Sequence, residues 1–412
     1  MTASTGVLDD NTAQIAMASA SSPTHPPRSV STASAGISVP GDRTIYPERK
    51  APRAACRATL SYAQTINMRL FTLLCLVAGS ALAQNCEPGC LARSNAATID
   101  ADGTARITRV IELPATISPE ARSLVGRQPG PAAKNLEENR ARTDTFRKTR
   151  SEEARRLYPV NIEEQVIGGV RTDVITPLTI AGTKRDHVLV NVHGGGFVTD
   201  SGSLVEGIPI ANLTGTKVVS VYYRLAPEHP FPAAVDDTVA VYKELLKTYK
   251  PEHIGLFGTS AGAILTAETA VRLRELGLPL PAALGVFSGL GDLGGWDDSR
   301  ALFTLSGFGG PQPEKPREPS AYVGKTDPKN HVLSPIYADL KGFPPTLFVT
   351  STRDILLSGT TLLHRAFLRA GVPAELVVFE ALPHAFWYDY RLPETKEALG
   401  IMAGFFDRSL GK

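Results

Sequence analysis

The stretch GTSAG at positions 258–262 decides the fold. It follows a strand-like run, His253 to Gly258, and precedes a helix-like run, Ala261 to Leu276. A G-x-S-x-G between strand and helix is typical of a nucleophile elbow, a sharp turn that lifts Ser260 out of the sheet. Strand and helix then pass so close to the serine that only glycine fits on either side of it. The amide of Ala261 is left free at a helix N-terminus, where developing negative charge is favoured.

Small residues also fill strand-to-helix turns for packing reasons alone. The rest of the chain must therefore decide between a nucleophile elbow and an ordinary turn.

The 412 residues of the chain are 42% hydrophobic and 20% charged, as in a soluble globular protein with one large core. Length suggests two or three domains, although α/β folds often form one long domain. The 43 basic and 41 acidic residues include no long basic run, which argues against a nucleic-acid partner.

All four cysteines, Cys56, Cys75, Cys86 and Cys90, lie in the first quarter of the chain. The remaining three quarters therefore contain neither a disulfide framework nor a cysteine nucleophile. Cys86 and Cys90 either close a small loop in an oxidising compartment or remain free thiols. No second cysteine or histidine pair has zinc spacing, so we predict no metal and no cofactor.

The N-terminal region reads as two segments. Residues 1–67 are rich in Ser, Thr, Ala and Pro, and are either a disordered extension or a misassigned start. Residues 68–83 have the charge, apolar run and A-x-A site of a signal peptide beginning at Met68, which predicts export to the periplasm or medium and a mature chain from Gln84. An organelle-targeting extension is one alternative. An uncleaved anchor is disfavoured, because the run is shorter than the ~20 residues that span a bilayer.

Residues 84–160 are polar and predict N-terminal cap helices at 119–125 and 135–157. Residues 161–412 then read as an α/β domain that opens with a hairpin, 161–167 and 170–176, turning at Gly168-Gly169. Further strands are expected at 188–192, 217–223, 284–288, 346–350 and 374–379, and helices at 233–249, 359–370 and 394–410. This alternation predicts a mostly parallel central sheet flanked by helices.

The stretch 289–335 interrupts the alternation with Gly, Pro and isolated aromatic residues. A connection this long is uncommon unless it is functional. We expect it to form, with the N-terminal helices, a lid over the carboxyl ends of the strands, where ligands bind in such folds.

The sequence HGGGF at 193–197 directly follows the strand 188–192. Three glycines leave backbone amides uncovered, and with the Ala261 amide they can hold the oxyanion of a tetrahedral intermediate. The alternative is a flexible glycine turn. In either case we expect His193 to brace the loop and not to act as a base.

A nucleophilic serine needs a base and an acid that orients the base. Asp354 follows the strand 346–350 and His384 follows the strand 374–379, so both emerge at the same sheet edge as Ser260. Their order along the chain, Ser then Asp then His, is the order of this fold type. The other histidines lie in a helix pattern, in the expected lid or before Ser260.

These motifs resemble the hormone-sensitive lipase family of α/β-hydrolases, also called bacterial family IV esterases. The resemblance runs from Val188 to the C-terminus and rests on HGGGF at 193–197, YRLAPEHPFPAA at 223–234, GTSAG at 258–262 and PHAF at 383–386. Many members carry Asp at position 259, and a subset resembles this chain in carrying Thr. The resemblance implies a nucleophile, Ser260, a general base, His384, an orienting acid, Asp354, and an oxyanion hole drawn from Gly194, Gly195, Gly196 and Ala261.

We therefore expect a cofactor-free carboxylic-ester hydrolase that acts through an acyl-enzyme on short to medium acyl or aryl esters. Phe197 and Trp296 are our candidate substrate contacts, with Phe303 and Phe308 as further apolar lid residues. The rival predictions are a lactone or arylamide hydrolase with the same triad, a long-chain lipase, and a non-catalytic small-molecule receptor on the same fold. We expect a small-molecule ester as partner and no stable membrane anchor, and leave homodimerisation open.

Overall fold

The computed structural model describes residues 96–127, 130–309, 315–316 and 320–411. The expectations for 1–67, for the signal peptide at 68–83 and for Cys86 and Cys90 lie outside these residues.

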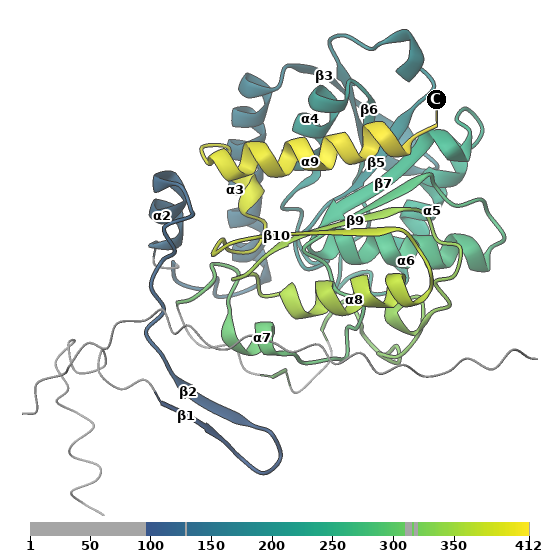
Figure 1. Ribbon diagram of the computed structural model, residues 1–412. Coiled ribbons are helices and arrows are strands. Elements are labelled where there is room, and N and C mark those ends of the chain that lie inside the picture. The colour runs from purple at the N-terminus through teal and green to yellow at the C-terminus, as the bar shows by residue number, and fades with distance from the viewer. Residues whose placement is uncertain (1–95, 128–129, 310–314, 317–319, 412) are drawn as a thin grey trace, which may run out of the picture. The chain divides into compact units, whose positions relative to one another are not determined.

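An eight-stranded sheet forms the centre of the described chain (Figure 1). The order of its strands is β10-β9-β8-β7-β5-β6-β4-β3. The first six strands in this order are parallel to one another, whereas β4 is antiparallel to both β6 and β3. The bounds are β3 Val160–Ile167, β4 Val170–Pro177, β5 Val188–Val192, β6 Lys217–Val221, β7 Ile254–Thr259, β8 Ala283–Phe287, β9 Thr346–Ser351 and β10 Ala374–Phe379. The predicted α/β-hydrolase fold, with its mostly parallel sheet, is confirmed.

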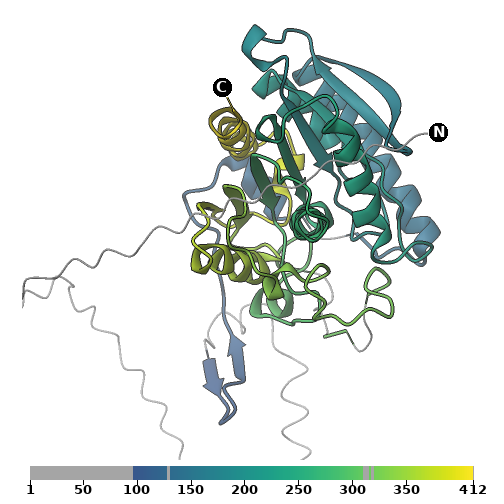
Figure 2. The ribbon, with the colours of Figure 1, turned by 90° about the vertical axis from the view of Figure 1, so that its right-hand side faces the viewer.

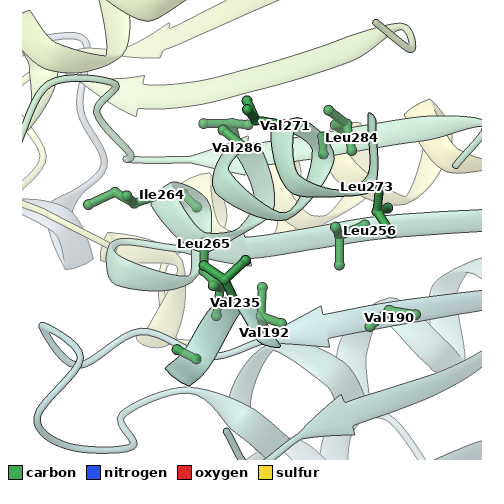
Figure 3. Packing of buried hydrophobic residues seen from close by; sticks show 14 of the residues in the cluster. Val190, Val192, Val235, Leu256, Ile264, Leu265, Val271, Leu273, Leu284 and Val286 are labelled. Carbon is green, nitrogen blue, oxygen red and sulfur yellow. The ribbon is translucent and has the colours of Figure 1, made fainter. Parts of the chain in front are cut away.

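Helices cover both faces of the sheet, as the turned view shows (Figure 2). One face carries α5 (Ala233–Leu245), α6 (Ala261–Glu275) and α8 (Leu357–Arg369), and the other carries α4 (Ser203–Thr214) and α9 (Pro393–Ser409). Buried strand side chains alternate between the two cores because successive residues point to opposite faces. Val190, Leu256 and Val286 pack toward α6 (Figure 3), whereas Phe257 and Phe287 pack toward α9.

The sequence patterns did not reveal α4. This helix is buried on nearly all sides and contains Gly207 and Pro209, so it has neither an apolar stripe nor the residues of a good helix former. A methyl group on Gly207 would lie 2.5 Å from Cδ1 of Ile175, so the missing side chain lets α4 lie directly on the sheet. Nor was the hairpin of β1 (Ala96–Ile99) and β2 (Ala105–Thr108) predicted.

The N-terminal region contains α2 (Pro119–Val125) and α3 (Leu136–Leu157). Side chains of Ser118 and Asn135 cap these helices by accepting hydrogen bonds from the amides of Ala121 and Glu138. Arg140 of α3 forms a two-pronged ion pair with Glu228, at 2.7 Å for each contact. This pair ties the cap to the segment that contains YRLAPEHPFPAA.

The insertion 289–335, expected to be a lid, divides into two parts. Its second part belongs to the main core, because Tyr322, Val323, Val332 and Leu333 are buried with residues of α5 and α6. Its first part holds the short helix α7 (Asp298–Leu302) and the loop around Leu305 and Ser306. Among the residues of this insertion that the structure describes, only that loop borders the cavity described below, so the lid expectation is corrected to this smaller segment. Proline and glycine content alone does not distinguish a lid from a well-packed irregular segment.

Candidate active site

The elbow at 258–262 has the geometry predicted from its sequence. Ser260 lies between β7 and α6 with φ +60° and ψ −122°, a conformation that non-glycine residues adopt only where the surroundings enforce it. A Cβ atom on Gly258 would lie 2.1 Å from the carbonyl oxygen of Val192, and one on Gly262 would lie 1.9 Å from the same oxygen. Both glycines are required because β5 passes directly beside the turn.

His384 and Asp354 form a hydrogen-bonded pair. Nδ1 of His384 lies 2.7 Å from Oδ1 of Asp354, and the two side chains are almost completely buried. Nε2 of His384 is also buried and has no hydrogen-bond partner among the residues that the structure describes. The imidazole thus has one nitrogen fixed by a carboxylate and the other available, as a general base requires.

Several donors hold Asp354 in its charged form. Oδ2 accepts hydrogen bonds from the hydroxyls of Ser288 and Thr350, and Oδ1 accepts one from the amide of Leu356. Burial acts to raise the pKa of Asp354, but His384 and the hydrogen bonds from Ser288 and Leu356 hold that pKa below its ordinary value. Asp354 is therefore a carboxylate at neutral pH and favours an imidazolium beside it.

The glycine loop after β5 presents unengaged amides to the same place. Gly195 and Gly196 line the cavity that Ser260 lines, and both have positive φ. Within the described part of the chain, their amides and that of Ala261 donate no hydrogen bond to a protein acceptor. A Cβ atom on Gly195 would lie 2.2 Å from the carbonyl oxygen of Thr199, so the loop cannot take this shape with another residue there.

Aromatic contacts brace this loop. His193 is buried and stacks on Tyr223 with ring centroids 4.1 Å apart, while its Nδ1 lies 2.8 Å from the carbonyl oxygen of Gly194. Tyr223 donates a hydrogen bond of 2.6 Å to the carbonyl oxygen of His193. His193 thus braces the loop, as its sequence position suggested.

Ser260 and His384 both line a cavity of about 790 Å³. Its apolar wall comes from four separate segments: Leu124 and Phe146 of the N-terminal helices, Val198 of the glycine loop, Leu305 of the insertion, and Phe386 beyond His384. The cap and the catalytic edge of the sheet therefore enclose one space, large enough for a small organic molecule.

The two candidate substrate contacts lie elsewhere. Phe197 is buried and stacks on Tyr322 with ring centroids 3.5 Å apart, and is not among the residues that line the cavity. Trp296 lies beside Arg300 and is likewise absent from the lining. Phe303 and Phe308 pack on each other, 4.9 Å between centroids.

Sequence reasoning missed several residues around the site, among them Ser288, Thr350 and the cavity-lining residues of α3. Ser288 and Thr350 stand at the carboxyl ends of β8 and β9, beside Asp354, so their position along the strands was an available signal. Phe146 gave no such signal, because the packing of α3 against α4 leaves no local trace in the sequence.

Among the residues that the structure describes, no group of three or more His, Cys, Asp or Glu side chains is arranged to hold a metal ion. None of the helices found there has the length and apolar character to cross a bilayer.

Comparison with known proteins agrees with this geometry. Residues 189–388 match the family model described as alpha/beta hydrolase fold. An acetyl-hydrolase of Streptomyces hygroscopicus is 33% identical over 231 residues, which cover 54% of this chain and 76% of that protein. An esterase of Acinetobacter venetianus is 29% identical over 269 residues, covering 61% of this chain and 84% of that protein.

Solved structures give the same result. The crystal structure of an esterase, E25, aligns with a TM-score of 0.63 and 31% identity, covering 74% of this chain and 98% of that one. An esterase from the bacterial hormone-sensitive lipase family aligns with a TM-score of 0.60 and 32% identity, covering 71% and 99%. By sequence and by structure, the chain belongs to the bacterial hormone-sensitive lipase family of α/β-hydrolases and is a carboxylic-ester hydrolase.

Proposed function

We propose that the protein hydrolyses short to medium acyl or aryl esters through an acyl-enzyme formed on Ser260. The observation that carries this proposal is the buried hydrogen-bonded pair of Asp354 and His384. Nε2 of His384 has no partner among the described residues, and His384 lines the same cavity as Ser260. A strained serine, an oriented imidazole and free amides are the three parts of an acyl-transfer site.

In the first half-reaction, Oγ of Ser260 attacks the ester carbonyl carbon as Nε2 of His384 takes the hydroxyl proton. The negative charge that forms on the carbonyl oxygen is held by free amides, for which Gly195, Gly196 and Ala261 are the donors that the geometry supports. Collapse of the intermediate breaks the bond to the alcohol oxygen, which receives the proton from His384.

In the second half-reaction, His384 takes a proton from water as the water oxygen attacks the acyl carbonyl carbon. Collapse of this second intermediate breaks the bond to Oγ, which regains its proton from His384, and the carboxylic acid leaves. Asp354 remains a carboxylate throughout and stabilises each imidazolium.

The cavity supports the proposed size of the substrate. Its volume of about 790 Å³ is shared between the acyl and alcohol groups, and Phe146, Leu305 and Phe386 give it an apolar wall. The acetyl-hydrolase relative adds support for a short acyl group.

Hydrolysis of p-nitrophenyl esters from acetate to long acyl chains, by the protein and its Ser260→Ala variant, tests the proposal. We expect rapid turnover of short esters and loss of that turnover in the variant. A panel of lactones and arylamides tests the rival substrates. A well-folded wild type that turns over none of these would overturn the proposal and favour a receptor role.

We further propose that residues 68–83 are a signal peptide, that the protein is exported and that it belongs to the GTSAG-containing subset of the family. The charged start, apolar run and A-L-A at 81–83 support export. Intact-mass analysis of protein from the native host tests it, since a chain that retains residue 1 would contradict it. Sedimentation would show whether a homodimer forms.

A further inference from the structure

An acidic side chain that the acyl-transfer steps do not use lies buried behind the elbow. Glu206 of α4 is only 3% exposed. Burying a carboxyl group costs free energy unless partners satisfy it, so its contacts indicate what it is for.

Glu206 has partners from three other segments. The hydroxyl of Tyr388 donates to Oε1, and Nδ2 of Asn191 donates to Oε2 at 3.3 Å. The hydroxyl of Thr259 lies near enough to the carboxyl group to lower its pKa. Burial raises the pKa of Glu206 to about 8, although these hydrogen bonds oppose the shift.

Thr259 has a second contact that closes a ring of side chains. Its hydroxyl accepts a hydrogen bond of 3.1 Å from Nε1 of Trp387, and both residues are buried. Trp387 and Tyr388 belong to the 3₁₀ helix Phe386–Tyr388, which follows His384. We call residues 384–388 the His384 segment. The ring thus consists of Thr259 from the elbow, Glu206 from α4, and Trp387 and Tyr388 from the His384 segment.

This ring joins the two residues that must meet for the proposed reaction. Thr259 immediately precedes Ser260, and Trp387 lies three residues after His384. Asp354 fixes Nδ1 of His384 but does not fix the distance between the histidine segment and the elbow. A misplacement of about 1 Å between reacting groups costs on the order of 100-fold in rate.

We propose that Glu206 is a positioning residue: through Thr259 and Tyr388 it holds the serine elbow and the His384 segment in register. The proposal gives position 259 a role, since a short hydroxyl side chain there accepts from Trp387 while it contacts the buried acid. It rests on the proposed triad, so the test must distinguish failure of the ring from failure of the triad.

Two tyrosines provide a matched pair of variants. Tyr388→Phe removes the hydroxyl that donates to Glu206, whereas Tyr390→Phe removes a hydroxyl that donates, at 2.5 Å, to the carbonyl oxygen of the neighbouring Val205. Both variants lose one hydrogen bond to α4, but only the first opens the ring. Tyr388 also lines the cavity, whereas Trp387 does not, so the Trp387 variant separates the ring from the cavity wall. Trp387→Phe opens it at the other side, and Glu206→Gln keeps an uncharged hydrogen-bonding group of the same shape.

The readouts are kcat and KM for p-nitrophenyl acetate and the rate at which a fluorophosphonate labels Ser260, below the unfolding midpoint of each variant. For Tyr388→Phe and Trp387→Phe we expect kcat and labelling rate to fall about 10- to 100-fold with KM changed less than about threefold. Tyr390→Phe should stay within about twofold of wild type, and Glu206→Gln within about threefold, because it replaces a protonated acid.

The proposal is overturned if folded Trp387→Phe or Tyr388→Phe keeps kcat within about twofold of wild type, or if Tyr390→Phe loses as much activity as Tyr388→Phe. Should Tyr388→Phe fail to fold, Trp387→Phe alone decides between these results. Failure of wild type to be labelled at Ser260 would instead refute the triad.

Discussion

Gly262→Ala tests the closest contact at the elbow. The added Cβ would lie 1.9 Å from the carbonyl oxygen of Val192 and 2.8 Å from that of His193. The first distance is roughly 1.5 Å shorter than an ordinary non-bonded contact of about 3.5 Å. Both obstacles are backbone atoms, which cannot rotate away, so β5 and the elbow must separate. Overpacking of this kind costs about 1–3 kcal/mol or more, and we expect the upper end.

The same separation moves Ser260 relative to Gly195 and Gly196, so kcat/KM should fall about 100-fold or more even in protein that remains folded. Urea unfolding and p-nitrophenyl acetate hydrolysis measure the two effects. Gly400→Ala is the matched control: no atom lies within 4 Å of the added Cβ, and alanine in helix α9 should stabilise the fold by about 0.5–1 kcal/mol. A Gly262→Ala protein with wild-type stability and kcat/KM would refute the packing argument.

Asp354→Asn should lower kcat about 10³- to 10⁴-fold with little change in KM, because the amide no longer favours the imidazolium; a loss below about tenfold would deny Asp354 its role. Because the pKa of Glu206 is raised, the folded protein binds more protons than the unfolded chain between about pH 4.3 and about pH 8. The free energy of unfolding therefore falls as pH rises through this window. The urea midpoint of the Glu206→Gln variant should accordingly vary less with pH than that of wild type. Phe146→Ala removes a lining side chain and enlarges the cavity, so KM for the hexanoate ester should fall relative to KM for the acetate ester. An unchanged ratio of the two KM values would place Phe146 outside the acyl pocket.

The sequence predicted those parts of the fold that have a local cause. Strands such as β5 and β7 appear as short apolar runs, and the G-x-S-x-G spacing follows from the passage of β5 beside the elbow. Asp354 and His384 were predictable because each follows a parallel strand, and the carboxyl ends of these strands meet at the same edge of the sheet as Ser260. Their place at that edge predicted that they would lie close together, and Nδ1 of His384 does lie 2.7 Å from Oδ1 of Asp354.

Features that depend on tertiary packing were not predictable in this way. Helix α4 escaped notice because its burial on nearly all sides removes the apolar period. The division of the insertion into a core part and a cavity loop depends on contacts with α5 and α6, which lie elsewhere in the sequence. Glu206 gave no signal either, since a lone glutamate in an apolar run has no pattern until Tyr388 and Thr259, distant in sequence, lie beside it.

The central claim is that hydrolysis passes through an ester bond to Ser260. Rapid mixing with p-nitrophenyl acetate, acid quenching and mass spectrometry of the digested protein test it most directly. The account predicts a burst of about one p-nitrophenol per active chain, an acetyl group on the peptide that contains Ser260, and neither in the Ser260→Ala variant. Turnover at the wild-type rate by Ser260→Ala, or an acetyl group on a different residue that forms and decays at the rate of turnover, would contradict it.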